Sequence, residues 1–453
     1  MDASGYRPTG SRDEAFDEDG RPRAAYAELI AALGDPADLG AHVADRVERD
    51  GIRFGKGYFT LDPVPRLIAA AEWERLAAGL SQRARALGAF VADAYGDRRI
   101  VSAGVMPAGV IETADHFEPW MLGVEIRPEA FVAGLDLVRG DDGELRVLED
   151  NTRTPSGMAY AAAARATVVD RLPPGPGVLD PEGAFELLGR TLRAAHPGGD
   201  PSIVLLSDGP ANAAWYEHRE IGRRLGIPVV QPPDVMVRKG RLHAWLGGGR
   251  TRQIDVVYRR TDEDLLRDRA GRATWLADLL LAPVRRGTLV VVNPFGAGLA
   301  DDKLVHAYVE EMVRFYLDEQ PLLGSVRTLD LSDDAIRAEA LDSLGELVVK
   351  PRSGLGGTGV VICRSCDPAE LESLAGDIER APKEFIAQER INLCTHPTVC
   401  DGRLEPRHVD LRPFVFGGGD VAPAALTRVA LGAGEMIVNS ARGGGAKDTW
   451  LAA

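Results

Sequence analysis

The stretch that decides the fold reads Leu148-Glu149-Asp150-Asn151-Thr152-Arg153-Thr154-Pro155-Ser156-Gly157. Before it, residues 135–148 form two apolar runs around an Asp-Asp-Gly turn, which predicts a hairpin that brings Asp136 opposite Glu149. Because side chains alternate along a strand, Glu149 and Asn151 share one face. Asp136, Glu149 and Asn151 then supply oxygen donors of the kind that Mg²⁺ binds together with waters and phosphates. The alternative for this stretch taken alone is a surface hairpin with ordinary solvated acids.

A glycine-rich segment far downstream carries the second half of the predicted site. Residues 347–362 contain two β-branched apolar runs around a loop with four glycines. The first run ends in Lys350, whose ammonium can meet a phosphate, and the glycines let backbone N–H groups approach phosphate oxygens. A strand follows instead of a helix, and Gly-Lys-Ser/Thr is absent, so this is not the usual phosphate loop. We interpret the segment as a cover over nucleotide phosphates, with a flexible hairpin turn as the alternative.

Together the two segments resemble the ATP-grasp ligases. Val349-Lys350-Pro351 with its glycine loop looks like their phosphate-covering hairpin, and Asp136 with residues 149–157 looks like their magnesium strand pair. In D-alanine:D-alanine ligases and glutathione synthetases the magnesium strands come last, whereas here they come first. This order is similar to that of the circularly permuted type 2 ATP-grasp family. Further segments that carry the resemblance lie at residues 61–66, 71–73, 82–87, 148–157, 300–303 and 443–450.

The resemblance implies an α/β chain with α+β lobes, namely an ATP-grasp fold in circularly permuted order with a Rossmann-like domain on the substrate side. Residues 1–22 have little apolar content and are predicted to be a mobile tail. N-terminal helices and the permuted magnesium-binding part are predicted at 23–175. The Rossmann-like domain follows at 176–325, where strands and helices alternate as in a parallel sheet. ATP-binding lobes with the glycine loop, adenine hinge and C-terminal strands are predicted at 326–453.

A long helix is predicted over residues 65–95, because apolar residues recur there at helical spacing. Gln82, Arg83 and Arg85 lie in a segment that resembles the family. Amide and basic residues of an amphipathic helix more often form its solvated face, which is the favoured interpretation here.

Composition and charge narrow the class of protein. Of the 453 residues, 45% are hydrophobic and 27% charged, as in globular proteins with large cores. The net charge of -15 disfavours nucleic acid as a partner, because duplex binding needs a basic face. The sequence shows neither a long apolar run nor a basic-then-apolar leader, so we expect no membrane partner and a cytoplasmic location. The oligomeric state cannot be read from the sequence.

The four cysteines leave two interpretations open. Cys363 and Cys366 have C-x-x-C spacing, and Cys394 and Cys400 follow with histidines nearby, so a zinc knuckle is one possibility. Reduced, unrelated thiols are favoured, because the second pair lacks a short metal-ligand spacing.

Most of the predicted ATP contacts follow from the resemblance. Lys303 stands at the start of a predicted helix, where a cation is unfavourable unless a phosphate offsets it. In the resemblance it matches a second phosphate-binding lysine. Gln388 and Glu389 match the hinge that holds adenine, with Ile391 packing on the adenine face. The predicted set is Lys303, Lys350, Ser353, Gly354, Gly356, Gly357, Thr358, Gln388, Glu389 and Ile391.

Substrate contacts are predicted at three places: near the magnesium strand pair, at the strand ends of the parallel sheet, and in a second glycine-rich loop. The strand ends are included because open parallel sheets bind their ligands there. Arg260 is favoured over Arg259, since consecutive strand residues face opposite sides. An arginine in an exposed salt bridge is the alternative. The predicted residues are Thr152, Arg153, Ser156, Gly157, Asn212, Glu217, Arg260, Asn439 and Gly444.

Three cations on the C-terminal strands, Arg412, Arg428 and Lys447, are predicted to be catalytic by neutralising a transferred phosphate or an acyl-phosphate. Standard ATP-grasp ligases have an arginine shortly before the first magnesium aspartate, at a position where this chain has Gly134. Arg412, Arg428 and Arg442 are the candidates to replace it.

The sequence therefore predicts a ligase that uses ATP and Mg²⁺ to activate a carboxylate as an acyl-phosphate and to join it to an amine of a small molecule or peptide. Two alternatives remain: a kinase that stops at phosphoryl transfer, and a nucleotide-binding scaffold without catalysis. Loop composition does not encode which acid and amine are joined.

Overall fold

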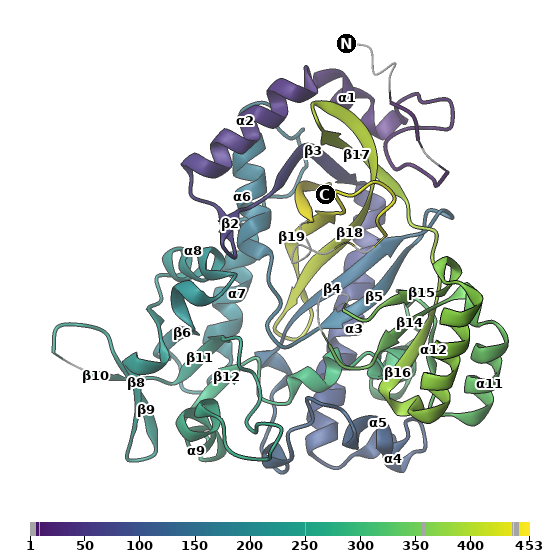
Figure 1. The fold of residues 1–453 in the computed structure, drawn as a ribbon. Helices are drawn as coiled ribbons and strands as arrows, with labels where there is room; N and C mark the ends of the chain where they lie inside the picture. The colour runs from purple at the N-terminus through teal and green to yellow at the C-terminus, as the bar shows by residue number, and fades with distance from the viewer. Residues whose placement is uncertain (1–5, 9, 250, 355–357, 437, 439–443) are drawn as a thin grey trace.

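The computed structural model describes residues 6–8, 10–249, 251–354, 358–436, 438 and 444–453. A seven-stranded sheet lies at the centre, with a smaller lobe on either side (Figure 1). Its strand order is β3 (Leu61–Ile68), β20 (Gly445–Leu451), β19 (Asp420–Val429), β18 (Arg403–Phe416), β4 (Val132–Arg139) and β5 (Leu145–Asn151), and β17 (Thr395–Cys400) pairs with β18. Strands β3 and β20 are parallel, so the sheet joins strands from both ends of the chain.

Helix α3 (Ala70–Tyr95) covers one face of this sheet, and α10 (Val309–Leu317) packs on it. Side chains alternate between the two faces of β4, and Leu135 and Leu137 point to the face that α3 covers. Both are fully buried in a hydrophobic core together with residues of α3. Asp136, between them, faces the opposite side. The predicted helix begins later than expected, at Ala70, because residues 66–68 pair with β20.

Five further α-helices of the described residues and a small hairpin complete the body around the central sheet. Helix α6 (Met158–Val168) contacts β19 and β20, and α2 (Pro36–Arg49) contacts β3. The other elements are α1 (Ala27–Ala32), α4 (Arg99–Ser102), α5 (Ala108–Glu112), β1 (Arg53–Phe54) and β2 (Gly57–Tyr58). Among the described helices, none combines the length and apolar character needed to cross a membrane.

One lobe holds a parallel four-stranded sheet in the order β12 (Val290–Val292), β11 (Val256–Arg260), β6 (Ile203–Ser207) and β7 (Val229–Val230). Helices α7 (Gly183–Ala194), α8 (Trp215–Leu225) and α9 (Ala282–Arg285) belong to the same lobe (Figure 1). The expected strand–helix–strand alternation is present as β6, α8 and β7. A separate antiparallel sheet of β8 (Val235–Arg238), β9 (Arg241–Trp245) and β10 (Thr251–Gln253) projects from this lobe.

The other lobe is the glycine-hairpin lobe, a four-stranded antiparallel sheet with two helices. Its order is β13 (Thr328–Asp330), β16 (Phe385–Glu389), β14 (Leu347–Pro351) and β15 (Val361–Ile362), with α11 (Asp334–Asp342) and α12 (Pro368–Arg380). Helix α12 starts at a capping box, in which Asp367 and Glu370 each bond the other's backbone N–H. Strands β14 and β15 pair on either side of the glycine loop, as the sequence predicts.

The N-terminal segment differs from the predicted mobile tail. Tyr6 and Phe16 are buried with their rings 4.4 Å apart, and the Asp13 carboxylate accepts the Tyr6 hydroxyl at 2.6 Å. Glu14 pairs with Arg66 at 2.6 Å. The prediction is therefore wrong for residues 6–8 and 10–22, because these few aromatic and acidic side chains find buried partners elsewhere in the chain. Residues 1–5 and 9 lie outside the described part.

Candidate active site

A cavity of about 670 Å³ lies where the central sheet, the glycine-hairpin lobe and the carboxyl ends of β6 and β11 meet. This volume is in the range of small-molecule sites in proteins. The β4–β5 strand pair and the glycine hairpin, far apart in the chain, both contribute to its wall. The two halves of the site predicted from the sequence therefore share one cavity.

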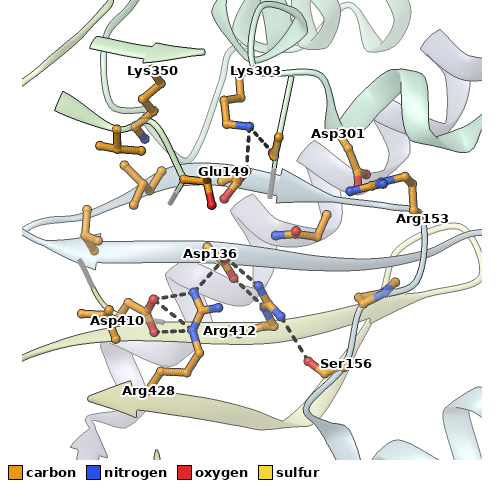
Figure 2. A pocket seen from close by; sticks show the side chains of 18 of the residues that line it. Asp136, Glu149, Arg153, Ser156, Asp301, Lys303, Lys350, Asp410, Arg412 and Arg428 are labelled. Atoms are coloured by element: carbon orange, nitrogen blue, oxygen red, sulfur yellow. Dashed lines mark hydrogen bonds and ion pairs between the residues drawn. The ribbon is translucent and has the colours of Figure 1, made fainter. Parts of the chain in front are cut away.

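Strands β4 and β5 pair in the predicted register, with Asp136 directly opposite Glu149. Asp136, Glu149 and Asn151 all line the cavity. Figure 2 shows the first two on adjacent strands, with Glu149 on the side of the lysines and Asp136 on the side of the arginines.

Two arginines hold Asp136. Arg412 donates to its carboxylate through Nε and Nη2 at 2.6 and 2.7 Å, and Arg428 through Nη2 at 2.8 Å (Figure 2). Burial alone would raise the pKa of Asp136, but both guanidiniums outweigh it and lower the pKa to about 2. Arg428 also bonds Asp410, whose own pKa is raised by burial despite that partner. Asp136 is thus ionised over the whole physiological pH range.

Two lysines face this pair from the opposite wall. Lys303 Nζ lies 3.8 Å from the Glu149 carboxylate and donates to the Gly354 carbonyl at 2.9 Å. Burial lowers the pKa of Lys350 to about 8, and the charge of Lys303 adds to the shift, although Glu149 opposes it. The cavity therefore brings carboxylates and ammonium groups together.

Beneath the strand pair lies an ion-pair cluster that the sequence does not predict. Asp150 points away from the cavity and binds Arg83 Nε and Nη2 at 2.6 and 2.7 Å and His306 Nδ1 at 2.7 Å. Arg83 is 2% exposed and Gln82 3%, so the prediction of a solvated face is wrong for both. Arg83 is buried because it pairs with Asp150 of β5, and Gln82 is buried because it bonds Glu319 and the backbone of Gln320 and Leu322.

The predicted substrate residues separate into two groups. Arg153, Ser156, Asn212 and Arg260 line the cavity. Thr152, Gly157, Glu217 and Gly444 are not among its lining residues. Glu217 is buried and accepts the backbone N–H of Gly157 at 2.9 Å and Arg260 Nη2 at 3.1 Å, so it supports Arg260, which does line the cavity. Asn439 lies outside the described residues.

Arg153 and Arg260 are each fixed by neighbouring acids. Arg153 donates to Asp301 at 2.7 Å and to Asp264 at 2.8 Å. Arg259 is as buried as Arg260 but does not line the cavity, which is the arrangement expected for consecutive strand residues.

Most of the predicted ATP contacts lie in the cavity wall, namely Lys303, Lys350, Gly354, Thr358, Gln388, Glu389 and Ile391. Gln388 is 3% exposed, and its Oε1 has no hydrogen-bond partner among the described residues. Ser353 is exposed and does not line the cavity. Gly356 and Gly357 lie outside the described residues.

Lys447, one of the three cations predicted to be catalytic, lies outside the cavity. Its ammonium is fully buried, pairs with Asp62 of β3 and donates to the Pro397 carbonyl at 3.0 Å. Burial lowers its pKa, and Asp62 opposes that shift. Lys447 joins β20 to β3 and does not line the cavity, so the prediction of a catalytic role is wrong. Strand alternation alone could not reveal which face of β20 is covered.

ATP-grasp proteins have this architecture: a pair of strands that carries acidic side chains, here β4 and β5, lies opposite a lobe whose glycine hairpin carries a lysine. The chain belongs to the circularly permuted ATP-grasp type 2 family, whose model matches residues 65–430.

Relatives are found in several bacteria. The chain is 42% identical over 469 residues to a Frankia casuarinae protein with the name "Putative glutamate–cysteine ligase 2-2", and the match covers 98% of this chain and 54% of that protein. This chain thus spans about half the length of that relative. An uncharacterized Synechocystis protein is 37% identical, with 100% of this chain and 99% of the relative covered.

A solved structure shows the same fold. The glutathione synthetase-like effector of Globodera pallida matches with a TM-score of 0.59 and 13% sequence identity, over 93% of this chain and 99% of the effector. At this identity the match bears on the fold alone.

The oxygen donors of the strand pair fit the Mg²⁺ that such a family implies. Glu149 accepts no hydrogen bond from the described residues, and Asn151 lines the same cavity. Asp136 accepts three guanidinium hydrogen bonds, which leaves part of its carboxylate free. Two carboxylates and one amide form a hard donor set, and Mg²⁺ commonly binds to one or two carboxylates while it keeps waters and phosphate oxygens.

Proposed function

We propose that this protein is an ATP-dependent ligase that activates a carboxylate as an acyl-phosphate and joins it to an amine. The observation that carries the proposal is the single cavity in which Asp136 and Glu149 face Lys303 and Lys350. Paired acids and paired ammonium groups across one cavity suit a polyphosphate bound with its metal. The Frankia relative is about twice as long as the matched region, so its name supports only the general class of reaction proposed for this chain.

The proposed reaction has two steps. An oxygen of the substrate carboxylate attacks the γ-phosphorus of ATP, the bond from that phosphorus to the β-phosphate oxygen breaks, and ADP leaves. The amine nitrogen then attacks the acyl carbon, the carbon–oxygen bond to phosphate breaks, and the amine proton passes to solvent. Both steps depend on positioning and charge neutralisation, so no nucleophilic side chain is needed.

ATP would lie along the cavity wall formed by the glycine-hairpin lobe. Lys303, Lys350 and the loop at Gly354 would neutralise its phosphates. The free Oε1 of Gln388 is a buried acceptor for the amino group of adenine, with Ile391 beside it. Asp136, Glu149 and Asn151 would hold Mg²⁺, which, when bound, screens the charge of the triphosphate from the incoming carboxylate.

Arg412 is the proposed replacement for the arginine that this chain lacks at position 134. A Cβ built on Gly134 would lie 2.7 Å from Pro155 and 3.5 Å from Cδ of Arg412. The Arg412 side chain, which comes from the neighbouring strand β18, therefore lies beside the place where a side chain at 134 would start. Arg428 is a weaker candidate, because Asp410 holds it in addition to Asp136. Arg442 lies outside the described residues.

The substrates would occupy the side of the cavity that faces the parallel sheet, which we propose to be the Rossmann-like substrate domain. Arg153, Ser156, Asn212 and Arg260 line that side. Parallel sheets bind ligands beyond the carboxyl ends of their strands, which is where Asn212 and Arg260 lie.

The test is an ADP-release screen over amino acids and short peptides with Mg²⁺, in the presence and absence of amines. Glu149→Gln removes a proposed metal ligand and is expected to lower kcat/KM by about a hundredfold or more. Glu144→Gln, an exposed acid on the same hairpin, is the matched control and should behave like the wild type. Equal rates for wild type and Glu149→Gln would overturn the site, and ADP release that needs no amine would identify a kinase.

A further inference from the structure

The end of the cavity farthest from the glycine hairpin lies at the carboxyl ends of β6 and β11. Asn212, Arg260 and Asp262 line it there. Ser156 connects this end with the metal strand pair, because its hydroxyl accepts from Arg260 and its carbonyl accepts from Arg412 Nη1 at 3.3 Å (Figure 2). A molecule that reaches from one end to the other would pass Ser156.

Asp262, which lines this end of the cavity, and Asp208 beside it have no cationic partner among the described residues. Asp262 Oδ1 accepts Asn212 Nδ2 at 2.7 Å, and Asp208 Oδ2 accepts the Asp262 backbone N–H at 2.6 Å. No lysine, arginine or histidine of the described residues forms an ion pair with either carboxylate, although ion pairs hold the neighbouring Arg153 and Arg260. Burial and the charge of Asp208 raise the pKa of Asp262. The arrangement favours a ligand that brings a positive charge.

A buried histidine supplies an independent sign of a ligand. His218 is 1% exposed and lines the cavity, while its Nδ1 lies 2.8 Å from the hydroxyl of the fully buried Ser207. That hydroxyl accepts the Gly209 backbone N–H at 3.0 Å and must donate its own proton, for which His218 Nδ1 is the acceptor. The network therefore assigns the imidazole proton to Nε2.

His218 is consequently a neutral donor directed at the cavity. Burial, followed by the nearby charge of Arg260, lowers its pKa to about 2, so the ring stays uncharged at physiological pH. Nε2 has no hydrogen-bond partner among the described residues and is not one of their fully enclosed polar atoms. Because this N–H has no partner among the described residues and reaches the cavity, it can donate to an acceptor on a ligand.

We propose that this end of the cavity binds the zwitterionic head group of a free α-amino acid, with its ammonium on Asp262 and its α-carboxylate on His218 Nε2. The side chain of the amino acid then extends past Ser156 toward Asp136 and Glu149. The carboxylate that is phosphorylated is therefore the one on the side chain, and the acid substrate is an acidic α-amino acid. The inference rests on the proposed ligase function, because it names the acid that the ligase activates.

Three matched probes test the two contacts separately. L-Glutamate carries the full head group, glutarate lacks the ammonium, and 4-aminobutanoate lacks the α-carboxylate. Their dissociation constants are measured by calorimetry on the whole chain with Mg²⁺ and an ATP analogue that cannot transfer its γ-phosphate. The wild type is expected to bind L-glutamate about ten- to a hundredfold more tightly than either analogue, the usual range for a hydrogen bond to a charged group. L-Aspartate, succinate and β-alanine form the shorter series.

Each variant should remove one preference and keep the other. Asp262→Asn keeps the acceptor for Asn212 but loses the charge, so the preference for L-glutamate over glutarate should disappear. His218→Phe should abolish the preference over 4-aminobutanoate, and His218→Gln, which retains an N–H donor, should restore much of it. Asp200→Asn makes the same charge change at the opposite edge of the parallel sheet and should bind all probes as the wild type does.

The inference is overturned if the wild type binds the three probes equally, if it binds none of them, or if either preference survives in its own variant. ADP release on the same acids is measured separately. ADP release without a difference in affinity between the probes would support the ligase function and contradict the head-group subsite. A difference in affinity between the probes, with no ADP release for any combination of acid and amine, would support the subsite and contradict the ligase function.

Discussion

Burial lowers the pKa of Lys350 to about 8, so a nucleotide bound as proposed should have an affinity that depends on pH. Below pH 8 the side chain is charged and attracts phosphate, whereas above pH 8 the free protein loses that charge. We expect the affinity for a non-hydrolysable ATP analogue to be nearly constant from pH 6 to 7.5 and to fall by up to about tenfold per pH unit above 8. Calorimetric titration across this range measures the effect.

Lys350→Arg is the control for that prediction. A guanidinium stays protonated at every accessible pH, so its binding curve should lack the decline above pH 8. An equal decline in both proteins would assign the titration to a different group.

The Asp150 cluster gives a prediction on stability. Asp150→Asn leaves Arg83 and His306 buried beneath β5 without their anion, and breaking such a buried pair typically costs about 3–5 kcal/mol. Urea unfolding at pH 7 should show a loss of this size, and Glu144→Gln should show none. A loss below about 1 kcal/mol would mean that the cluster does not stabilise the hairpin.

At the scale of elements, the hairpin and the glycine loop could be predicted because their signals are local. Period-two alternation and an Asp-Asp-Gly turn specify β4 and β5 together with the pairing of Asp136 with Glu149. The burial of Arg83 and of Lys447 could not be predicted in this way. Each depends on one acid in a distant part of the chain, Asp150 and Asp62 respectively, and an amphipathic pattern does not say which charged residues are covered.

The N-terminal segment was mispredicted for a related reason, and Glu14 shows how it is held. Burial would raise the pKa of Glu14, but Arg66 and Arg139 outweigh it and lower the pKa to about 2. A carboxylate whose pKa falls from 4.5 in the unfolded chain to about 2 stabilises the fold above pH 4.5 by about 3 kcal/mol. This stabilisation is lost as the pH falls from about 4.5 to 2.

Glu14→Gln should therefore be less stable than the wild type in urea unfolding at pH 7, and the difference should shrink at pH 3. Glu18→Gln, an exposed neighbour in the same segment, should match the wild type at both values. A difference between Glu14→Gln and the wild type that does not change with pH would contradict the proposed ion pairs.

At the scale of the whole molecule, the central sheet explains why a permuted order can form the same site. Strand β3 pairs with the C-terminal strand β20, so strands from the start and the end of the chain are neighbours. The order of the motifs made this arrangement predictable from the resemblance. How the glycine-hairpin lobe is held against the body was not predictable, because that contact comes from single side chains on separate loops.

Arg352 makes that contact. It is 6% exposed and donates to Asp302 at 2.7 and 2.9 Å, to Thr113 Oγ1 at 2.6 Å and to the Val110 carbonyl at 2.5 Å. Asp302 precedes Lys303, which itself bonds the glycine hairpin. One guanidinium therefore connects helix α5, the segment that carries Lys303 and the glycine-hairpin lobe.

Arg352→Gln should loosen the lobe without unfolding the central sheet. We expect amide hydrogens of β14 and β16 to exchange at least tenfold faster, and the affinity for the ATP analogue to fall by about tenfold or more, since binding must then order the lobe. Arg364→Gln, an exposed arginine of the same lobe, is the matched control and should change neither quantity. If exchange accelerates equally in the central sheet, the variant is destabilised as a whole, and if neither quantity changes, Arg352 does not position the lobe.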